Sequence, residues 1–420
     1  MSAKTIENRP ELVGSYALLA GAELLGAGLG FLAVLLVART FGPDGLGEVS
    51  LAVNIVGYAA IFATCGTIES SVCRVAGRPE RLRSQVTDVI LLRTVLASVT
   101  YLAMLLVVRS VPQLAPVMVL TTILGLTLFL RAIDVSWIPL AFHRTAVLAS
   151  SQLARQALNL SVLWFALLRF GSLESVVWSR LVSELGITVA LGLWLVRRVA
   201  VPGSWSGLAA LGDLIRNSVP IAGTKLIRAL GVGSDLVVVG VLVDANELGI
   251  FSAAIRIFML LVTLSGAYFM ILLPRLVEAR SGGLHSLRRG LTQSLSLALP
   301  AAALALGCVA LIARPLLIGL FGQAYAGAAP ALRWLCLSLW FNVSAQHLRQ
   351  TLLVLERQRL DFVLSLLVIV IHIGVKIPLT MSFGITGAAF ATVVGEILMV
   401  ILLSAAVRSC LKRATGFSPK

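Results

Sequence analysis

Charged residues are scarce in this chain. Only 13% of its 420 residues are Asp, Glu, Lys or Arg, 58% are hydrophobic, and the mean hydropathy is +0.98. An ordinary soluble domain has a charged fraction of about a quarter. The composition therefore excludes a soluble globular domain and indicates a membrane protein.

Long polar segments are also absent. The connections between apolar runs are all short, so they leave no room for a soluble catalytic or nucleotide-binding domain. There is no GxxxxGK[ST] motif, and the glycines of Gly26–Gly30 lie in the middle of a run, where small residues predict close helix packing. We therefore expect a protein that is not an enzyme, with its function inside the membrane helices.

Cysteine and histidine are too few and too scattered for a disulfide framework or a metal centre. The five cysteines are an odd number and lie within or at the inner ends of apolar runs, which predicts no disulfide framework. No two of the four histidines have the spacing of metal ligands. We predict no metal site and no cofactor.

Long apolar runs are what the chain has in abundance. A helix needs about twenty apolar residues to cross the hydrocarbon, and twelve such runs follow one another. The first is too long for the apolar region of a signal peptide and is expected to be retained. The predicted fold is all-α, a polytopic membrane protein of about twelve transmembrane helices. The runs cover 13 to 38, 48 to 69, 86 to 108, 114 to 138, 146 to 168, 174 to 196, 215 to 243, 248 to 273, 293 to 313, 327 to 355, 361 to 381 and 385 to 408.

The cations of the connections lie mostly on one side. Both chain ends and the even-numbered connections carry most of them, and this excess identifies the cytoplasmic side. We therefore predict cytoplasmic termini in the inner (plasma) membrane. The net charge of +15 needs no nucleic acid to explain it, because cationic loops also contact anionic lipid headgroups. The cations predicted on the outer side are Arg39, Arg109, Arg169 and Arg314.

A short motif after the first run recurs later in the chain. The segment ARTFGPDGLGEVSLA begins at Ala38, and VGVLVDANELGIFSAAIRIF resembles it after a shift of 202 residues. This places Gly47 on Gly249 and Ser50 on Ser252. Such a recurrence indicates a duplicated helix pair, and we predict two six-helix bundles, residues 1–205 and 206–420.

Some charges fall inside the predicted spans, where each costs about 2.5–3.5 kcal/mol even on insertion scales. Arg131 with Asp134, and Arg180 with Glu184, have the spacing of partners on one helix face, which predicts structural pairs. The cations outnumber the acids, so the interior is expected to be cationic. These charges are Arg93, Arg131, Arg155, Arg180, Lys225, Arg228, Arg256, Arg333, Arg349 and Lys376, against Glu23, Asp134, Glu184, Asp235 and Glu396.

Two further interpretations apply to charges near the ends of spans and to one longer spacing. Arg93 and Lys376 are expected to reach the headgroups with their long side chains. Arg228 and Asp235 lie seven residues apart, which suits a bridge through a third group.

Polar stripes carry the remaining cations. Arg155 shares a helix face with Asn159, and Arg349 shares one with Asn342 and Gln346. Arginine offers a planar fork that matches phosphate oxygens, so such stripes suit a phosphate that carries sugar hydroxyls. The alternative is a role in helix packing. The predicted substrate-binding residues are Arg155, Lys225, Arg228, Arg256, Arg349, Asn159, Asn342 and Gln346, and the titratable candidates for ion coupling are Glu23, Asp235 and Glu396.

The span count and the ARTFGPDGLGEVSLA motif, with Arg74 closing the second span, resemble the polysaccharide transporter (Wzx-type flippase) branch of the MOP superfamily. The resemblance implies that two halves rock about a cationic lumen and move polyprenyl-pyrophosphate-linked oligosaccharide outward by alternating access, for a surface glycan such as O-antigen or exopolysaccharide. It also implies a polysaccharide polymerase and glycosyltransferases as partners. Related lipid II flippases carry arginines in spans one, two and eight. Here only Arg256 matches, since span one offers Glu23 and span two Asn54, and this argues against lipid II.

Two other classes remain open to the sequence. A MATE-type drug or cation antiporter shares this fold, but it needs cavity acids, which are outnumbered here. An integral membrane glycan polymerase or ligase usually needs a large outer loop, which this sequence does not contain.

Overall fold

The computed structural model describes residues 9–76, 82–142, 144–198 and 203–415, and every regular element within them is helical. The chain forms two compact units, one made of residues 1–40 and 48–229, the other of 41–47 and 230–420. The division falls inside helix α9, whereas the repeat predicts that the second half begins at residue 206. Helix α9 therefore contributes to both units.

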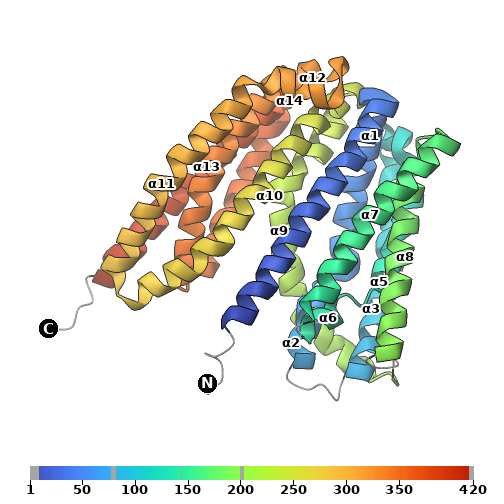
Figure 1. Cartoon of the computed structure of the whole chain (residues 1–420), viewed down its shortest axis with the longest axis horizontal. Helices are drawn as coiled ribbons and strands as arrows, with labels where there is room; N and C mark the ends of the chain where they lie inside the picture. Colours follow the sequence, from blue (N-terminus) through green and yellow to red (C-terminus); the bar gives the residue numbers. More distant parts are fainter. Residues whose placement is uncertain (1–8, 77–81, 143, 199–202, 416–420) are drawn as a thin grey trace. The chain divides into compact units, whose positions relative to one another are not determined.

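The first unit contains eight α-helices and a 3-10 segment, together with the first part of α9 (Figure 1). They are α1 (Arg9–Thr64), α2 (Thr67–Ala76), α3 (Leu82–Ser110), η3 (Pro112–Val117), α4 (Met118–Gly125), α5 (Thr127–Ala132), α6 (Trp137–Ala141), α7 (Thr145–Arg169), α8 (Glu174–Arg198) and α9 (Leu208–Leu242).

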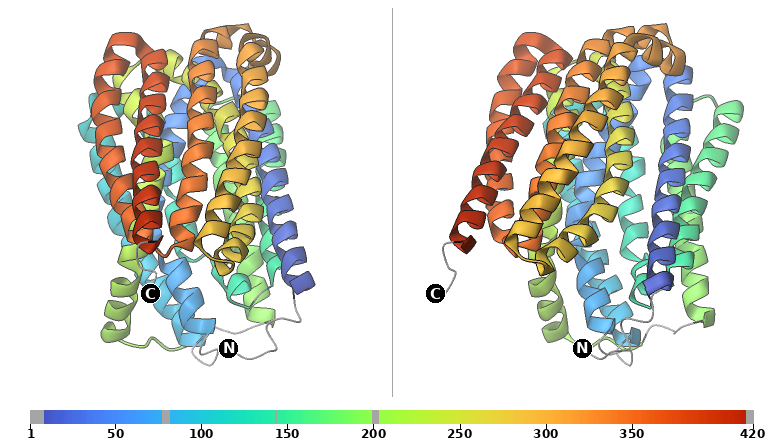
Figure 2. Two further views of the ribbon diagram at one scale, coloured as in Figure 1. Left: turned by 90° about the vertical axis from the view of Figure 1, so that its left-hand side faces the viewer. Right: turned by 60° about the vertical axis from the view of Figure 1, so that its left-hand side comes forward.

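The second unit contains the end of α9, four long helices and a short helical cap. Helix α13 packs against α10, α11 and α14, and Figures 1 and 2 show these four helices side by side. Its elements after α9 are α10 (Ala245–Ser281), α11 (Leu284–Leu311), α12 (Ala313–Phe321), η4 (Gln323–Ala328), α13 (Ala329–Val354) and α14 (Gln358–Thr415).

Each predicted span coincides with helical structure, which confirms the predicted polytopic all-α fold. Seven helical stretches in the described ranges are long and apolar enough to cross a membrane. Two of these stretches, within α1 and α14, each contain two predicted spans. A sharp kink separates the two spans, at Gly42 (φ 68°) in α1 and at Gly384 (φ 57°) in α14. Positive φ is readily adopted by glycine alone. The remaining spans lie in α7, α9 and α13.

The fourth predicted span is broken into short pieces rather than being one helix. Helix α5 ends at Ala132, and α6 begins at Trp137. The carboxylate of Asp134 holds this break, since it accepts hydrogen bonds from the Ser136 backbone nitrogen (3.1 Å) and hydroxyl (2.7 Å). Trp137 and Ile138 then enter the core of the first unit.

The structure explains why a glycine recurs at the same place in both copies of the motif. The turn of residues 41–47 belongs to the second unit, where it packs on the start of α10. A Cβ at Gly47 would collide with the Ala245 carbonyl oxygen, and a Cβ at Gly249 would collide with that of Pro43. Under the shift of 202 residues Pro43 corresponds to Ala245, so the two contacts are equivalent. The two copies of the motif therefore meet through a reciprocal backbone contact.

Candidate functional site

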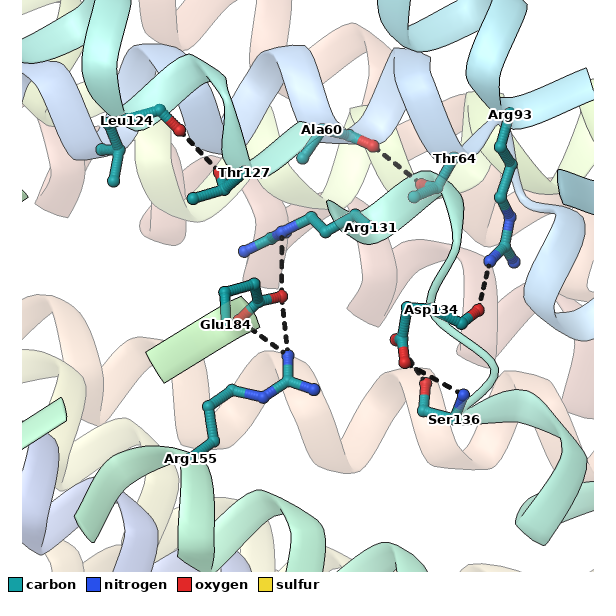
Figure 3. A network of polar contacts seen from close by, with 10 residues as sticks. All are labelled: Ala60, Thr64, Arg93, Leu124, Thr127, Arg131, Asp134, Ser136, Arg155 and Glu184. Carbon is teal, nitrogen blue, oxygen red and sulfur yellow. Dashed lines mark hydrogen bonds and ion pairs between the residues drawn. The ribbon is translucent and has the colours of Figure 1, made fainter. Parts of the chain in front are cut away.

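In the first unit, Glu184 on α8 pairs with two arginines from neighbouring helices (Figure 3). Arg155 Nη1 donates to both of its carboxylate oxygens, at 2.9 and 3.0 Å. Arg131 Nε lies 3.7 Å from the same carboxylate. Glu184 is buried, and Arg155 is partly exposed. The carboxylate thus ties α5, α7 and α8 together.

The predicted pair of Arg131 with Asp134 is wrong. The i,i+3 spacing brings two side chains together only on a continuous helix, but α5 ends between these residues. Arg131 therefore reaches Glu184, while the Asp134 carboxylate bonds to Ser136 in the turn.

Arg93 on α3 is buried inside the first unit, so the prediction that it reaches the headgroups is wrong. Its side chain is 1% exposed. Nε donates to the Thr67 hydroxyl at 2.6 Å. Nη1 donates to the Asp134 carbonyl oxygen at 3.1 Å (Figure 3). The broken fourth span leaves that carbonyl without a helical partner, so Arg93 stabilises the break.

The predicted cations of α9 fall in the first unit. Lys225 Nζ lies 2.8 Å from the Glu69 carboxylate, and both side chains are partly exposed. Close by, the hydroxyls of Ser70 and Ser218 share a hydrogen bond of 2.6 Å. The side chain of Arg228 lies outside the described residues.

The other predicted members of the first unit are Asn159 and Glu23. Asn159 is buried, and its Oδ1 accepts a hydrogen bond from the Ser179 hydroxyl at 3.3 Å. Glu23 is exposed on α1. The Gly26–Gly30 stretch packs on Gln156 of α7, whose Oε1 would lie 3.5 Å from a Cβ at Gly30. This is an ordinary van der Waals contact between α1 and α7, and close packing at these glycines stays a prediction.

In the second unit, Lys376 and Asp235 form a buried ion pair. Lys376 Nζ donates to Asp235 Oδ1, and the Thr392 hydroxyl donates to Oδ2 at 3.2 Å. The side chains of Lys376 and Asp235 are 0% and 4% exposed. The prediction that Lys376 reaches the headgroups is therefore wrong, because the carboxylate on α9 gives its ammonium a partner in the interior. Buried His372 lies one turn before Lys376.

A second polar group of this unit joins α13 to α14. Asn342 Nδ2 donates to Glu396 Oε1 at 2.9 Å. One and two turns further along α13 lie Gln346, which is half-buried, and Arg349, whose Nε is 3.6 Å from the Asp361 carboxylate. The structure thus brings the predicted residues Asn342, Arg349 and Glu396 into one region.

Arg256 differs from these cations. It lies on α10 between the buried residues Ile255 and Ile257. The residue is half-buried, and its buried Nε has no hydrogen-bond partner among the described residues. A buried charged nitrogen without a partner is costly, so an anion is the kind of ligand that this position would favour.

Sequence reasoning missed the pairing of most of these residues. The partners of Arg155, Lys225 and Lys376 lie on other helices, 29, 156 and 141 residues away in the chain. His372 was not among the predicted site residues. Its spacing of four from Lys376 was the available signal that both face one side of α14.

Comparison with known proteins gives one family match. The family model described as "Polysaccharide biosynthesis protein" matches residues 12–280. Among curated proteins, no sequence matches this chain.

Solved structures match over nearly the whole chain. An inward-facing multidrug resistance MATE family transporter of the MOP superfamily has a TM-score of 0.77 and 15% identity, covering 93% of this chain and 96% of the other. The lipid II flippase MurJ in an inward closed conformation has a TM-score of 0.76 and 13% identity, covering 95% and 90%. A MOP superfamily transporter from Pyrococcus furiosus, described by a reverse polarity of its binding pocket, has a TM-score of 0.62 and 15% identity, covering 96% of each chain. Likeness at this identity shows the fold.

Proposed function

The chain belongs to the polysaccharide biosynthesis protein family, and from this premise we propose that it is a flippase for lipid-linked oligosaccharide. It moves a polyprenyl-pyrophosphate-linked glycan from the inner to the outer leaflet by alternating access, for surface polysaccharide biosynthesis. Glycosyltransferases supply this substrate, and a polysaccharide polymerase consumes it. The protein lies in the plasma (inner) membrane with both termini in the cytoplasm.

The state of Arg256 is the observation that carries this proposal. Its buried Nε has no partner among the described residues, although a charged group in a membrane span normally pairs with another group. A pyrophosphate supplies the oxygens that match a guanidinium fork. Arg256 is therefore the residue that we assign to the substrate phosphate.

Three of the other predicted cations have exchangeable carboxylate partners. Arg155, Lys225 and Arg349 each pair with an acid, and all three side chains remain 28–35% exposed. Partly exposed pairs are weak, so a substrate phosphate can compete for them. Arg228 belongs to the same proposed set. Asn159, Asn342 and Gln346 are the proposed contacts for sugar hydroxyls.

The membrane potential gives such a transporter a direction. Moving one negative charge outward across an inside-negative membrane is favourable by about 2.3 kcal/mol per 100 mV. An anionic phosphate therefore gains from export without ATP. Glu23, Asp235 and Glu396 remain the candidates for coupling to an ion in addition.

A drug or cation antiporter of the MATE type is the alternative, because the similarity to a MATE transporter supports the same fold. A cation carrier needs carboxylates that are open to its substrate. In the described spans the buried acids Glu184 and Asp235 already pair with cations, and cations outnumber acids in the predicted spans, which favours an anionic substrate.

Substitution of Arg256 in a deletion strain tests the proposal. Arg256→Glu should abolish surface glycan, and Arg256→Lys should reduce it, because lysine keeps the charge but lacks the fork. Arg280→Gln, on the exposed inner end of α10, is the matched control. Full glycan export by Arg256→Glu at normal protein level would overturn the assignment. A strain that keeps its glycan but becomes dye-sensitive without the protein would favour the antiporter.

A further inference from the structure

We propose that Glu396 is a proton-binding carboxylate of the second unit, and that Asn342 links its protonation to substrate binding. The site consists of Glu396 on α14, Asn342 on α13 and the charges that surround them. The coupling role rests on the proposed transport function, whereas the proton site itself does not.

Asp235 is unsuited to exchange a proton because both of its oxygens are occupied. Lys376 holds Oδ1 and Thr392 holds Oδ2, in a place where the ion pair is almost fully buried. Protonating Asp235 would leave the Lys376 ammonium charged and alone in the interior, which is strongly unfavourable. This carboxylate is therefore expected to stay ionised.

Glu396 has the opposite surroundings. Its Oε1 accepts a hydrogen bond from the neutral amide of Asn342 at 2.9 Å, and no cation forms an ion pair with it among the described residues. Arg349, a cation that acts on its charge, has Asp361 as a partner at 3.6 Å. A proton can therefore bind to Glu396 without leaving a cation unpaired.

The other charges around Glu396 fit the same conclusion. From α9, the Asp235 carboxylate opposes its negative charge, and from α13, Arg349 favours it. On α14 itself, His372 and Lys376 lie beside Asp235, and the His372 ring would contact a Cβ at Gly395. Arg349 and Asp235 each have an ion-pair partner of their own, so Glu396 can gain or lose a proton without breaking an ion pair.

A proton suits this place better than a metal ion. A hard metal ion such as Ca²⁺ or Mg²⁺ needs several oxygen ligands around it. Glu396 is instead contacted by an amide nitrogen and lies near a guanidinium, neither of which can bind a metal ion. The described residues contain no group of three or more His, Cys, Asp or Glu side chains that could hold a metal.

The hydrogen bond gives protonation a consequence for substrate. A negatively charged Glu396 holds the Asn342 amide, whereas a neutral acid accepts more weakly. Binding of a proton thus releases the Asn342 donor for a sugar hydroxyl. Proton and substrate would be coupled through one side chain.

Infrared difference spectroscopy tests the proton site on the full chain in nanodiscs, with pH as the only variable. Acidification should produce the carbonyl stretching band of a protonated carboxylic acid. Glu396→Gln should remove this band, Glu396→Asp should shift its frequency, and the exposed control Glu278→Gln should leave it unchanged. Absence of the band in the unmodified protein, or its survival in Glu396→Gln, would overturn the proposal. Loss of the band in Asp235→Asn, with the band kept in Glu396→Gln, would assign the proton to Asp235.

Glycan export in cells tests the coupling. The unmodified protein and Glu396→Asp should export at a rate that varies with external pH, and Glu396→Gln should lose that variation. Export that never depends on the protein would refute the proposed function while leaving the infrared result intact. Export that depends on the protein and keeps its full pH response in Glu396→Gln would refute the coupling alone.

Discussion

The backbones at Gly47 and Gly249 approach so closely that a Cβ at Gly47 would lie 3.0 Å from the Gly249 nitrogen. The contact is supported on one side by a hydrogen bond of 3.3 Å from Asn246 Nδ2 to Asp44 Oδ2. Asp44 and Asn246 are also related by the shift of 202 residues. The glycines recur in the repeat because only a residue without a side chain permits this contact.

Gly249→Ala should lower the thermal stability of the protein. The new methyl group would meet the Pro43 carbonyl oxygen, and relieving such overpacking costs about 1–3 kcal/mol. Thermal unfolding of the purified chain measures the effect. Gly307→Ala on α11 is the control, since its Cβ would meet no atom within 4 Å. Equal melting temperatures for the two variants would contradict the close contact.

Removing either charge of the buried Asp235–Lys376 pair should strongly lower the stability of the protein. Asp235→Asn or Lys376→Met leaves one charge without its partner, which costs about 3–5 kcal/mol. The double variant carries no unpaired charge and should recover much of the stability. A double-mutant cycle on thermal unfolding measures the coupling. Additive effects of the two changes would show that the residues do not interact.

The three charged residues Arg131, Arg155 and Glu184 should contribute unequally to the stability of the protein. Arg131→Gln should change stability by less than about 1 kcal/mol, because its side chain is 44% exposed and 3.7 Å from the carboxylate. Glu184→Gln should cost more, since it removes the partner of both arginines. Arg155→Gln should fall between them. Urea unfolding in detergent gives the order, and an Arg131→Gln effect as large as that of Glu184→Gln would refute it.

Gly384→Ala should destabilise α14 at its kink. The backbone there has φ 57° and ψ −143°, a region almost confined to glycine, and other residues lose about 1–3 kcal/mol in such conformations. Gly374→Ala lies in the same helix, and its Cβ would meet no atom within 4 Å, so it is the matched control. Identical melting curves for the two variants would show that the kink adapts.

The sequence was sufficient for the spans because each one is a local property. An apolar run of the right length predicts a helix without knowledge of its neighbours. The break at Asp134 was not predictable in this way, since the run continues through it and only the bonds to Ser136 and Arg93 reveal the turn. The kinks at Gly42 and Gly384 do coincide with the ends of predicted runs.

The pairing of charges was not predictable because it depends on which helices are neighbours. The i,i+3 rule concerns one helix only, whereas Arg155 and Lys376 find partners across helices. The sequence did identify Arg256 as a candidate cation of the substrate site. The structure adds that its buried Nε has no partner among the described residues, which is a tertiary property.

The turn of residues 41–47 lies in the second unit although the chain on both sides of it belongs to the first. The polypeptide therefore passes between the units at three points rather than through one linker. Cutting the gene between the units would remove residues 41–47 from the partner on which they pack. Expression of this chain as two separate halves, one for each unit, is thus disfavoured.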